Sequence, residues 1–324
     1  MPRYDPGHRH EIERFDLEYR RAGRDTLLAR VYRPLGNGPF PALLDVHGGI
    51  WSYLDRTADA PIDEGLAASG LVVVAIDFRL APPHSYPASI ADVNYATRWL
   101  KAHASELKAD PRRLGGLGVS SGGHMVMLSA MRPNDPRYAV LPLADAPELD
   151  ARLAYVVACW PVMDPYRRYV NAQETSYDGT AVESAGPFGS PEVLRQRILK
   201  AQLDYFGTLE AMQEGNPRLI LERQEPVNLP PTLLLHGTAD TNVPIVMAED
   251  FAAAYRAAGG VLEFEVFLNA PHFFGLQGGP DAHRALRLIK AFIARQLGHA
   301  ARGPRRHGHT RDGNRARPAV IRSW

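Results

Sequence analysis

A serine stands among glycines in the segment GVSSGG, residues 118–123. Gly118, Ser120 and Gly122 fit the pattern G-x-S-x-G, whose small flanking residues let a nucleophilic serine occupy a sharp turn between a strand and a helix. Ser121 lacks the two flanking glycines, so we expect it to contribute its backbone N–H instead. The pattern is short enough to occur by chance in loops, and its meaning therefore depends on the elements around it.

A serine hydroxyl is a poor nucleophile at neutral pH and needs a base, which a carboxylate in turn orients. Downstream, TLLLHGTAD ends in Asp240 and LEFEVFLNAPH ends in His272. Taken alone, Asp240 could be a helix N-cap, and His236, which precedes the acid, is expected to be a packed histidine at a strand end. Nucleophile, acid and base nevertheless follow one another in the order used by α/β hydrolases. The sequence thus predicts Ser120 as nucleophile, Asp240 as acid and His272 as base.

Glycines in HGGIW, residues 47–51, could supply hydrogen-bond donors to a tetrahedral intermediate. Without side chains, glycines let backbone N–H groups approach a substrate closely. We expect donors from Gly48, Gly49 and the N–H of Ser121, with Ile50 as a further candidate. The alternative is a simple Gly-Gly turn.

These residues need strands and helices to position them. Two β-rich runs at 15–20 and 27–32, with Gly23 between them, predict an opening antiparallel pair. Short apolar runs, several nearly continuous as in strands buried on both faces, then follow at 41–46, 71–78, 113–119, 155–160, 232–237 and 262–268. Helical patterns lie at 62–69, 90–107, 124–131, 247–258 and 281–297.

Strands alternating with helices predict an α/β fold: a mostly parallel, doubly wound sheet with helices on both faces and ligands beyond the carboxyl ends of the strands. The alternation stops over residues 164–228, where only 192–205 and 209–214 have a helical pattern. We therefore expect one core domain, residues 1–163 and 229–299, with 164–228 inserted as a cap or lid.

Aromatic residues are frequent in and near the insert, which suggests either an aromatic-lined pocket for an apolar group or packing of the cap on the core. They are Tyr166, Tyr169, Tyr177, Phe188, Tyr205 and Phe206, together with Trp51 and Trp160. We expect Ile50, Trp51 and Trp160 to contact the substrate.

The composition is that of a soluble globular protein, 45% hydrophobic and 23% charged. No apolar run is long enough to cross a membrane, and the charged opening residues do not resemble a signal peptide, so we expect a cytoplasmic protein without a membrane partner. Cys159, the single cysteine, lies in an apolar run and is expected to be inert. No metal-binding motif is present.

The net charge of +1 hides an asymmetry, because residues 300–324 contain seven arginines and one aspartate. This basic tail has no hydrophobic period and is expected to be disordered. It could bind nucleic acid weakly, but the mildly acidic body offers no basic face to continue it, so we expect no nucleic-acid partner.

Five segments together resemble a known family: HGGIW, DFRLAPPHSYPASIADV (77–93), GVSSGG, HGTADTNVP and PHFF. They are similar to the α/β-hydrolases of the hormone-sensitive-lipase type and to the neighbouring acetyl-esterase and feruloyl-esterase-like group, over about residues 15–298. The resemblance implies a serine carboxylesterase that needs no cofactor. It also implies that Asp77 and Arg79 are structural, and we expect them to be paired. One departure is Ile50, in place of the third glycine of the lipase-type HGGG. HGG followed by one residue and then Trp is also similar to the aryl-formamidase pattern.

The expected function is hydrolysis of a small carboxylic ester through an acyl-enzyme. An amide hydrolase of the aryl-formamidase or anilide type would use the same residues, and a non-catalytic small-molecule receptor on the same fold is a third reading. Members of the family often pair through an edge strand or an outer helix, so a homodimer is one expectation, although no residue of this chain identifies such an interface.

Overall fold

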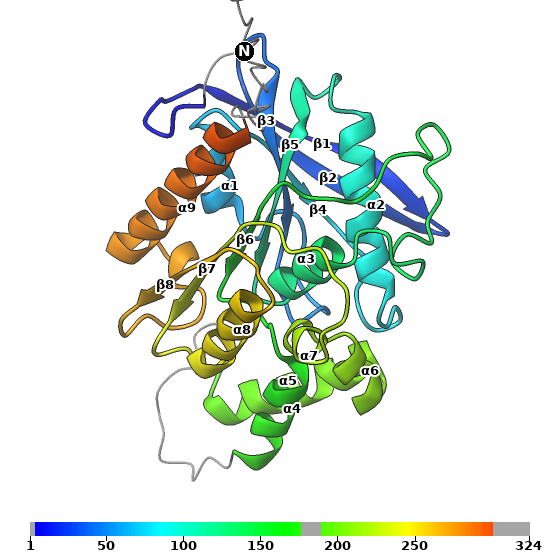
Figure 1. The fold of residues 1–324 in the computed structure, drawn as a ribbon, viewed down its shortest axis with the longest axis vertical. Coiled ribbons are helices and arrows are strands. Elements are labelled where there is room, and N and C mark those ends of the chain that lie inside the picture. Colours follow the sequence, from blue (N-terminus) through cyan, green and yellow to red (C-terminus); the bar gives the residue numbers. More distant parts are fainter. Residues whose placement is uncertain (1–3, 176–188, 301–324) are drawn as a thin grey trace, which may run out of the picture.

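Eight strands form one mixed sheet through the centre of the protein (Figure 1). The structure is a computed structural model that describes residues 4–175 and 189–300. The strand order is β1-β2-β4-β3-β5-β6-β7-β8. β1 (Ile12–Ala22) and β2 (Asp25–Pro34) form an antiparallel pair at one edge, and β2 is antiparallel to β4.

The remaining strands run parallel to one another. They are β3 (Phe40–Val46), β4 (Val72–Ile76), β5 (Ala109–Val119), β6 (Val156–Cys159), β7 (Thr232–Gly237) and β8 (Leu262–Phe267). Their carboxyl ends therefore meet at one edge of the sheet, where ligand sites of such folds lie.

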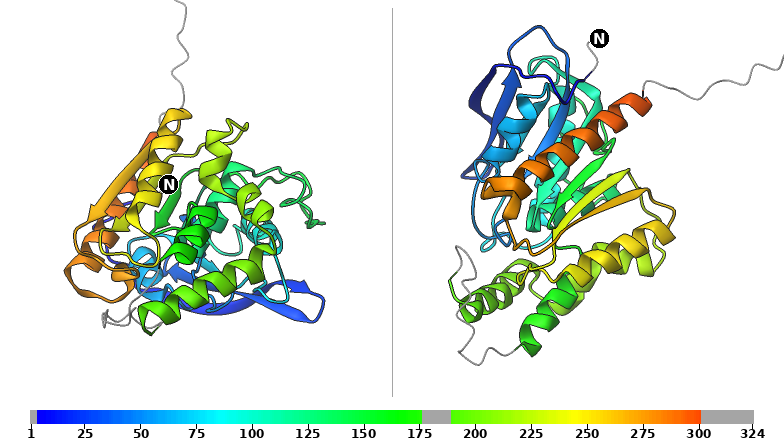
Figure 2. Two further views of the ribbon diagram at one scale, coloured as in Figure 1. Left: turned by 90° about the horizontal axis from the view of Figure 1, so that it is seen from below. Right: turned by 90° about the vertical axis from the view of Figure 1, so that its left-hand side faces the viewer.

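Helices cover both faces of the sheet (Figure 2). One face packs against α1 (Ala60–Ala67) and α9 (Gly279–Ala300). The other packs against α2 (Ala88–Ala102), α3 (Ser121–Met131) and α8 (Ile245–Ala257). This arrangement confirms the expected mostly parallel sheet with helices on both faces.

The alternation of side chains along β4 explains its continuous apolar sequence. Val72, Val74 and Ile76 belong to the core on the α2, α3 and α8 side. Val73 and Ala75 belong to the core on the α1 and α9 side. Because successive side chains of a strand point to opposite faces, a strand covered by helices on both faces must be apolar at every position.

Between β6 and β7 the described residues, 160–175 and 189–231, form four helices at the carboxyl-terminal edge of the sheet (Figure 1). They are α4 (Pro165–Glu174), α5 (Pro191–Phe206), α6 (Leu209–Glu214) and α7 (Pro217–Glu222). Each helix is preceded by a polar N-cap residue whose side chain accepts a hydrogen bond from a first-turn N–H: Asp164, Ser190, Thr208 and Asn216. Residues 164–228 are called the cap segment below.

Two carboxylates tie the cap segment together and to the core. Buried Asp164 accepts hydrogen bonds from Asn216 Nδ2 and Arg218 Nε, both at 2.6 Å. Glu214 accepts from Arg132 Nη1 at 2.7 Å, immediately after α3. The cap helices are therefore bound to one another and to the nucleophile-side helix by charge-assisted hydrogen bonds.

Several element boundaries differ from the sequence-based expectation. α3 begins at Ser121, directly after the serine turn, and α4 and α7 were not expected. α4 and α7 are short helices that start at proline, which weakens their periodic pattern. Two of the aromatic residues singled out above, Tyr177 and Phe188, and the basic tail beyond residue 300 lie outside the described residues.

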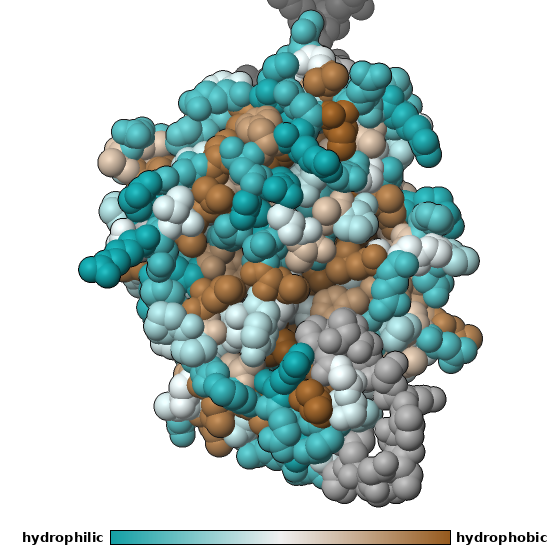
Figure 3. Space-filling model, turned by 180° about the vertical axis from the view of Figure 1, so that it is seen from behind, coloured by the Kyte–Doolittle hydropathy of each residue, from teal (hydrophilic) through white to brown (hydrophobic). Residues whose placement is uncertain are grey.

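The surface mixes hydrophilic and hydrophobic residues, with a hydrophobic band across the middle of the face in Figure 3. Within residues 4–175 and 189–300, no helix has both the length and the apolar character needed to cross a membrane.

Candidate active site

Ser120 occupies a strained turn between β5 and α3. Its backbone angles, φ 54° and ψ −117°, lie where residues other than glycine are rarely found. The turn is held by hydrogen bonds from Ser120 N to Cys159 O at 2.9 Å and from Val162 N to Ser120 O at 3.1 Å. Gly122 is required because a Cβ there would lie 1.9 Å from the carbonyl oxygen of Val46. These features are those of a nucleophile turn.

The loops after β7 and β8 bring an acid and a histidine to this serine. His272 Nε2 lies 3.0 Å from Ser120 Oγ, and His272 Nδ1 lies 2.6 Å from Asp240 Oδ2. A carboxylate only accepts, so Nδ1–H donates to Asp240 and leaves Nε2 free to accept the serine proton. The structure therefore brings together the three residues predicted as nucleophile, base and acid.

Asp240 is held in place from both of its oxygens. Oδ1 accepts hydrogen bonds from the N–H groups of Asn242 and Val243, at 2.9 and 2.8 Å, which leaves Oδ2 for His272. It is not the N-cap of α8, because Pro244 holds that position and no side chain caps the helix. The alternative reading of Asp240 as a helix cap is thus wrong.

Burial and neighbouring charges set the protonation of the pair. Burial alone would raise the pKa of Asp240, but interactions with His272 and His236 hold it below its ordinary range. Burial lowers the pKa of His272 below 6.5, and Asp240 only partly opposes this shift. At neutral pH the aspartate is charged and the histidine neutral, as a base must be.

His236 does more than pack at the end of β7. Its Nε2 lies 2.8 Å from the carbonyl oxygen of Val243 and 3.2 Å from Asp240 Oδ2. Both oxygens can only accept, so Nε2–H is shared between them and adds a second donor to Asp240 Oδ2. The position of His236 before Asp240 in the sequence did not reveal this contact, because the chain turns back over residues 237–239 to make it.

The segment after β3 lies against the serine turn. A Cβ on Gly48 would lie 3.1 Å from Cβ of Ser120, and Gly49 has φ 102°. A Cβ on Gly49 would lie 2.0 Å from Tyr53 O, so this position also requires glycine. Ile50 and Trp51 continue the left-handed path with φ 55° and 59°.

The peptide between Gly48 and Gly49 is oriented by the preceding histidine. Nδ1–H of buried His47 donates to Gly48 O at 2.8 Å. In a trans peptide the N–H points opposite to the C=O, so the N–H of Gly49 is turned away from the His47 ring. Among the hydrogen bonds of the described residues, none uses the N–H of Gly48 or Gly49 as donor. These groups are available to a ligand.

The residues expected to contact the substrate have buried side chains. Ile50, Trp51 and Trp160 are 3%, 0% and 0% exposed. The Trp51 indole stacks on Tyr205 of α5 at 4.9 Å, and Trp160 packs edge-on against Phe274, in the turn after His272. Packing of the cap on the core accounts for the Trp51 contact and packing within the core for the Trp160 contact, and a role in substrate binding stays a prediction.

Asp77 and Arg79 each have a partner, but not each other. Asp77 pairs with Arg56, at 3.1 Å, and Arg79 Nε pairs with Asp92 at 2.8 Å. The expectation that both charged side chains are paired is therefore confirmed.

A buried arginine near the acid was not found from the sequence. Arg168 of α4 is 2% exposed and donates to Asn242 O at 3.1 Å, to Gln202 Oε1 at 2.9 Å and to Asn242 Oδ1. Because Asn242 N–H donates to Asp240, Arg168 connects the cap segment to the loop that holds the acid. The segment YRRY, residues 166–169, was not expected to be helical and carries no signal for such a contact.

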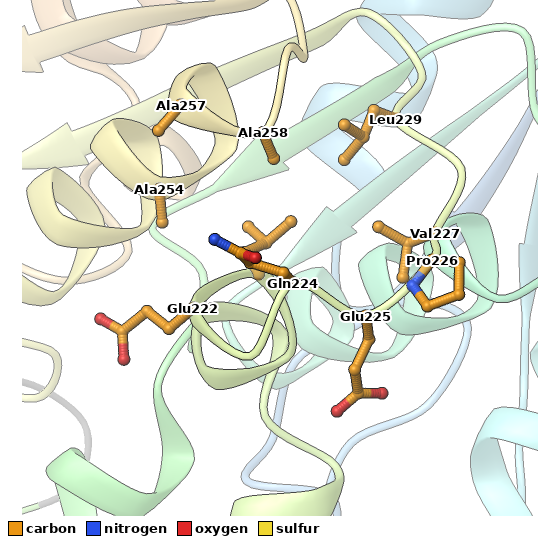
Figure 4. Close-up of a pocket in the computed structure, with 10 residues that line it drawn as sticks. Glu222, Gln224, Glu225, Pro226, Val227, Leu229, Ala254, Ala257 and Ala258 are labelled. Atoms are coloured by element: carbon orange, nitrogen blue, oxygen red, sulfur yellow. The ribbon is translucent and has the colours of Figure 1, made fainter.

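A surface groove of about 550 Å³ lies between α7, α8 and the segment leading to β7 (Figure 4). It is lined by apolar residues including Val227, Leu229 and Ala254, with Glu222 and Glu225 at its sides. No member of the serine, histidine and aspartate group lines it. Within the described ranges, no cluster of histidine, cysteine, aspartate and glutamate is arranged to hold a metal ion.

Comparison with known proteins identifies relatives of this chain. The probable carboxylic ester hydrolase LipM of Mycobacterium tuberculosis is 29% identical over 286 residues, covering 86% of this chain and 60% of that protein. The esterase LipC of the same organism is 29% identical over 255 residues, covering 76% and 57%. The chain thus spans about three fifths of the length of these curated relatives.

Solved structures match the fold. Esterase 2 of Thermogutta terrifontis phosphonylated by sarin has a TM-score of 0.67 at 24% identity, covering 91% of this chain and 96% of that one. The butyrate-bound form has a TM-score of 0.65 at 24% identity, covering 88% and 94%. These matches confirm the expected α/β-hydrolase fold.

The BD-FAE family model matches residues 30–255, which include HGGIW at 47–51, the serine turn and Asp240. This match extends over more than half of the chain. The chain therefore belongs to the BD-FAE family, with the α/β-hydrolase fold.

Proposed function

We propose that this protein is a serine carboxylesterase that hydrolyses small carboxylic esters. One observation carries the proposal: Ser120 Oγ, His272 and Asp240 form a continuous hydrogen-bonded series with distances of 3.0 and 2.6 Å. The names of the relatives, which are carboxylic ester hydrolases and esterases, support the same activity.

In the proposed reaction, Ser120 Oγ attacks the ester carbonyl carbon while His272 Nε2 takes the serine proton. The tetrahedral intermediate collapses, His272 gives the proton to the departing alkoxide, and an acyl-enzyme on Ser120 remains. Water, deprotonated by His272, then attacks the acyl-enzyme and releases the acid. Asp240 keeps Nδ1 protonated and stabilises the imidazolium formed in each half.

The negative charge on the carbonyl oxygen requires donors that are already in place. We assign this role to the N–H groups of Gly48, Gly49 and Ser121. The orientation of the Gly48–Gly49 peptide by His47 supports the assignment. So does the position of Ser121 as the first residue of α3, because first-turn N–H groups of a helix have no acceptor within it.

The cap segment, residues 164–228, is proposed to cover the site. Ser120 and His272 are only 3% and 9% exposed, and Tyr205 of the cap stacks on Trp51 beside the serine turn. A substrate that reaches Ser120 would pass beneath this segment.

The test is steady-state hydrolysis of short and medium p-nitrophenyl esters by the wild type and by Ser120→Ala. We expect kcat in the variant to fall by roughly 10⁴-fold or more, because removing the nucleophile of such a triad costs about this much. Ser129→Ala is the matched control, since it removes a buried hydroxyl of α3 that has no hydrogen-bond partner among the described residues. Equal rates for wild type and Ser120→Ala would contradict the proposal.

The same assay, extended to a matched aryl formamide and an anilide, separates ester from amide hydrolysis. Esterase specialisation predicts higher kcat/KM for the ester than for either amide. The reverse order would assign the triad to an amide hydrolase. A folded wild type that is inert on every substrate and does not react with a fluorophosphonate would favour the receptor reading.

A further inference from the structure

Another buried histidine lies four residues after Ser120 and joins three parts of the protein. His124, on α3, is fully buried. Its Nδ1 lies 3.2 Å from the indole Nε1 of Trp51, and its Nε2 lies 2.7 Å from the carbonyl oxygen of Gly215 in the cap segment. An indole N–H only donates and a carbonyl only accepts, so Nδ1 must accept and Nε2–H must donate. The contacts fix one neutral form of the ring.

Residues 47–51, called the oxyanion segment here because donors are assigned to Gly48 and Gly49, end at Trp51. Ile50 and Trp51 both have positive φ, a conformation that side chains other than glycine adopt only when surrounding contacts enforce it. Trp51 N–H donates to Ser121 Oγ at 3.3 Å, and its ring is held by His124 on one side and by Tyr205 on another. These contacts are what enforce the conformation.

The other end of the connection is also fixed. Gly215 ends α6, with its N–H bonded to Ala211 O at 2.9 Å. A Cβ at Gly215 would lie 2.9 Å from the ring of Tyr86. The preceding residue, Glu214, is bonded to Arg132 on the core. The Gly215 carbonyl, which accepts the hydrogen bond from His124, therefore cannot move without displacing the end of α6.

We propose that His124 is a positioning residue that holds the oxyanion segment, through Trp51, in the conformation that presents its N–H groups to the reacting carbonyl. The inference rests on the proposed esterase function. It also makes the geometry of the oxyanion segment depend on docking of the cap, since the same imidazole binds both. His124 itself does not touch the reacting atoms.

The protonation of His124 is consistent with this role. Burial lowers its pKa to about 4, with the Gly215 carbonyl and Glu214 only partly opposing the shift. The ring is therefore neutral at neutral pH, and Nδ1 can accept the indole hydrogen bond. A protonated ring could not.

Two variants separate the two hydrogen bonds. The side-chain oxygen of asparagine can take the place of Nδ1, so His124→Asn keeps an acceptor for Trp51 and gives up the donor to Gly215. The side-chain nitrogen of glutamine can take the place of Nε2, so His124→Gln keeps that donor and leaves the indole N–H without its acceptor. Trp51→Phe removes the indole N–H while keeping a ring against Tyr205.

We expect kcat to fall about tenfold to hundredfold in His124→Gln and Trp51→Phe with little change in KM, because misplaced donors weaken binding of the transition state more than of the substrate. His124→Asn should lose less. Affinity for a boronic acid, which mimics the tetrahedral intermediate, should fall in parallel with kcat, whereas affinity for the product carboxylate should not. The kcat of the double variant, His124→Gln with Trp51→Phe, should be no lower than that of the slower single variant, since both substitutions remove the same hydrogen bond.

Fluorophosphonate titration of Ser120 counts the competent protein in each preparation, so that partial misfolding does not enter kcat. His103→Asn is the matched control: His103 directly follows α2 and its ring stacks on that of Trp99 at 4.8 Å. It should retain wild-type kinetics.

The outcomes distinguish this inference from the proposed function. If the wild type hydrolyses esters and both His124→Gln and Trp51→Phe keep its kcat, the inference alone is overturned. Equal losses of affinity for the boronic acid and the carboxylate would also overturn it, because they indicate general damage. A wild type without Ser120-dependent turnover would overturn the proposed function and this inference with it.

Discussion

At the scale of single residues, His272 is surrounded by groups that move its pKa in opposite directions. Burial lowers the pKa most, Asp240 raises it, and His236 and Arg168 lower it further. Arg168 donates its hydrogen bonds to Asn242 and Gln202, and its charge acts on His272 through space. The balance leaves the base neutral at a lower pH than a histidine in water.

The pH dependence of the reaction follows from this balance. Because the folded-state pKa of His272 is lowered, the active neutral form persists below pH 6.5, and kcat/KM should fall only as the pH drops through the lowered value. Arg168→Met removes a positive charge that lowers this pKa, so its acid limb should move to higher pH. The measurement is kcat/KM for one ester from about pH 4 to pH 8.

Arg168→Lys is the control, since it retains the charge but not the three hydrogen bonds to Asn242 and Gln202. Its acid limb should stay close to that of the wild type, even where kcat falls. Identical limbs in Arg168→Met and wild type would show that the charge does not reach His272.

At the scale of elements, β3 and α1 enclose three buried carboxyl groups. Asp45, Asp59 and Asp63 are at most 1% exposed, and each has at least one side-chain oxygen without a hydrogen-bond partner among the described residues. Burial raises the pKa of Asp59 to about 8. Burial and the neighbouring carboxyls raise the pKa of Asp45 and Asp63 well above the ordinary range. The contact between β3 and α1 therefore favours protonated acids.

A raised pKa in the folded state means that the native protein holds protons that the unfolded chain releases. The stabilisation is present at acid pH and is lost as the pH rises through the raised values. Asp63→Asn removes one such proton and should make unfolding less dependent on pH. We expect the variant to be more stable than the wild type at about pH 9, because its folded state need not hold a proton there that the unfolded chain releases.

Chemical denaturation at about pH 5 and about pH 9 measures the effect. Asp145→Asn, at an exposed position between α3 and β6, is the control and should follow the wild type at both values. An Asp63→Asn variant that loses stability with rising pH as steeply as the wild type would contradict the assignment of a neutral carboxyl at this position.

Much of the element order could be predicted because the central strands β3, β4, β6 and β7 are mostly apolar on both faces and the longer helices have a helical period. The serine, acid and histidine could be placed together for a related reason: each follows a strand, and the carboxyl ends of parallel strands share one edge. α4 and α7 could not be predicted, because six- and ten-residue helices beginning at proline have too little periodic sequence.

The contacts that support the candidate site were harder to predict. Trp51 and His124 are 73 positions apart, and Arg168 and Asn242 are 74 apart. Both pairs depend on how segments distant in the sequence pack together, and local patterns contain no information about that. The sequence thus supplied the groups expected to react, and the structure added the groups that hold them.

At the scale of the whole molecule, the cap segment depends on one buried carboxylate for its internal order. Asp164 accepts from Asn216 and Arg218 as well as from the N–H of Arg167. Asp164→Asn leaves the Arg218 guanidinium without that buried carboxylate and should cost about 3 kcal/mol of stability, since removing one partner of a buried pair is strongly destabilising.

Thermal unfolding followed by circular dichroism measures this loss, and ester turnover should fall with it. Asp204→Asn, which breaks an exposed pair with Lys200 in the same segment, is the control and should leave the melting curve unchanged. A melting temperature for Asp164→Asn equal to that of the control would contradict the role assigned to Asp164.

The hydrogen bond between Ser120 and His272 joins residues 152 positions apart. Bringing together groups so distant in the chain requires that β5 to β8 have already assembled in register, and topologies rich in such contacts fold slowly. Reaction of Ser120 with a fluorophosphonate during refolding would therefore record the last step of assembly. Far-ultraviolet circular dichroism, which follows helices, should reach its native value earlier. The rate at which Ser120 becomes reactive would therefore measure how fast the sheet is completed.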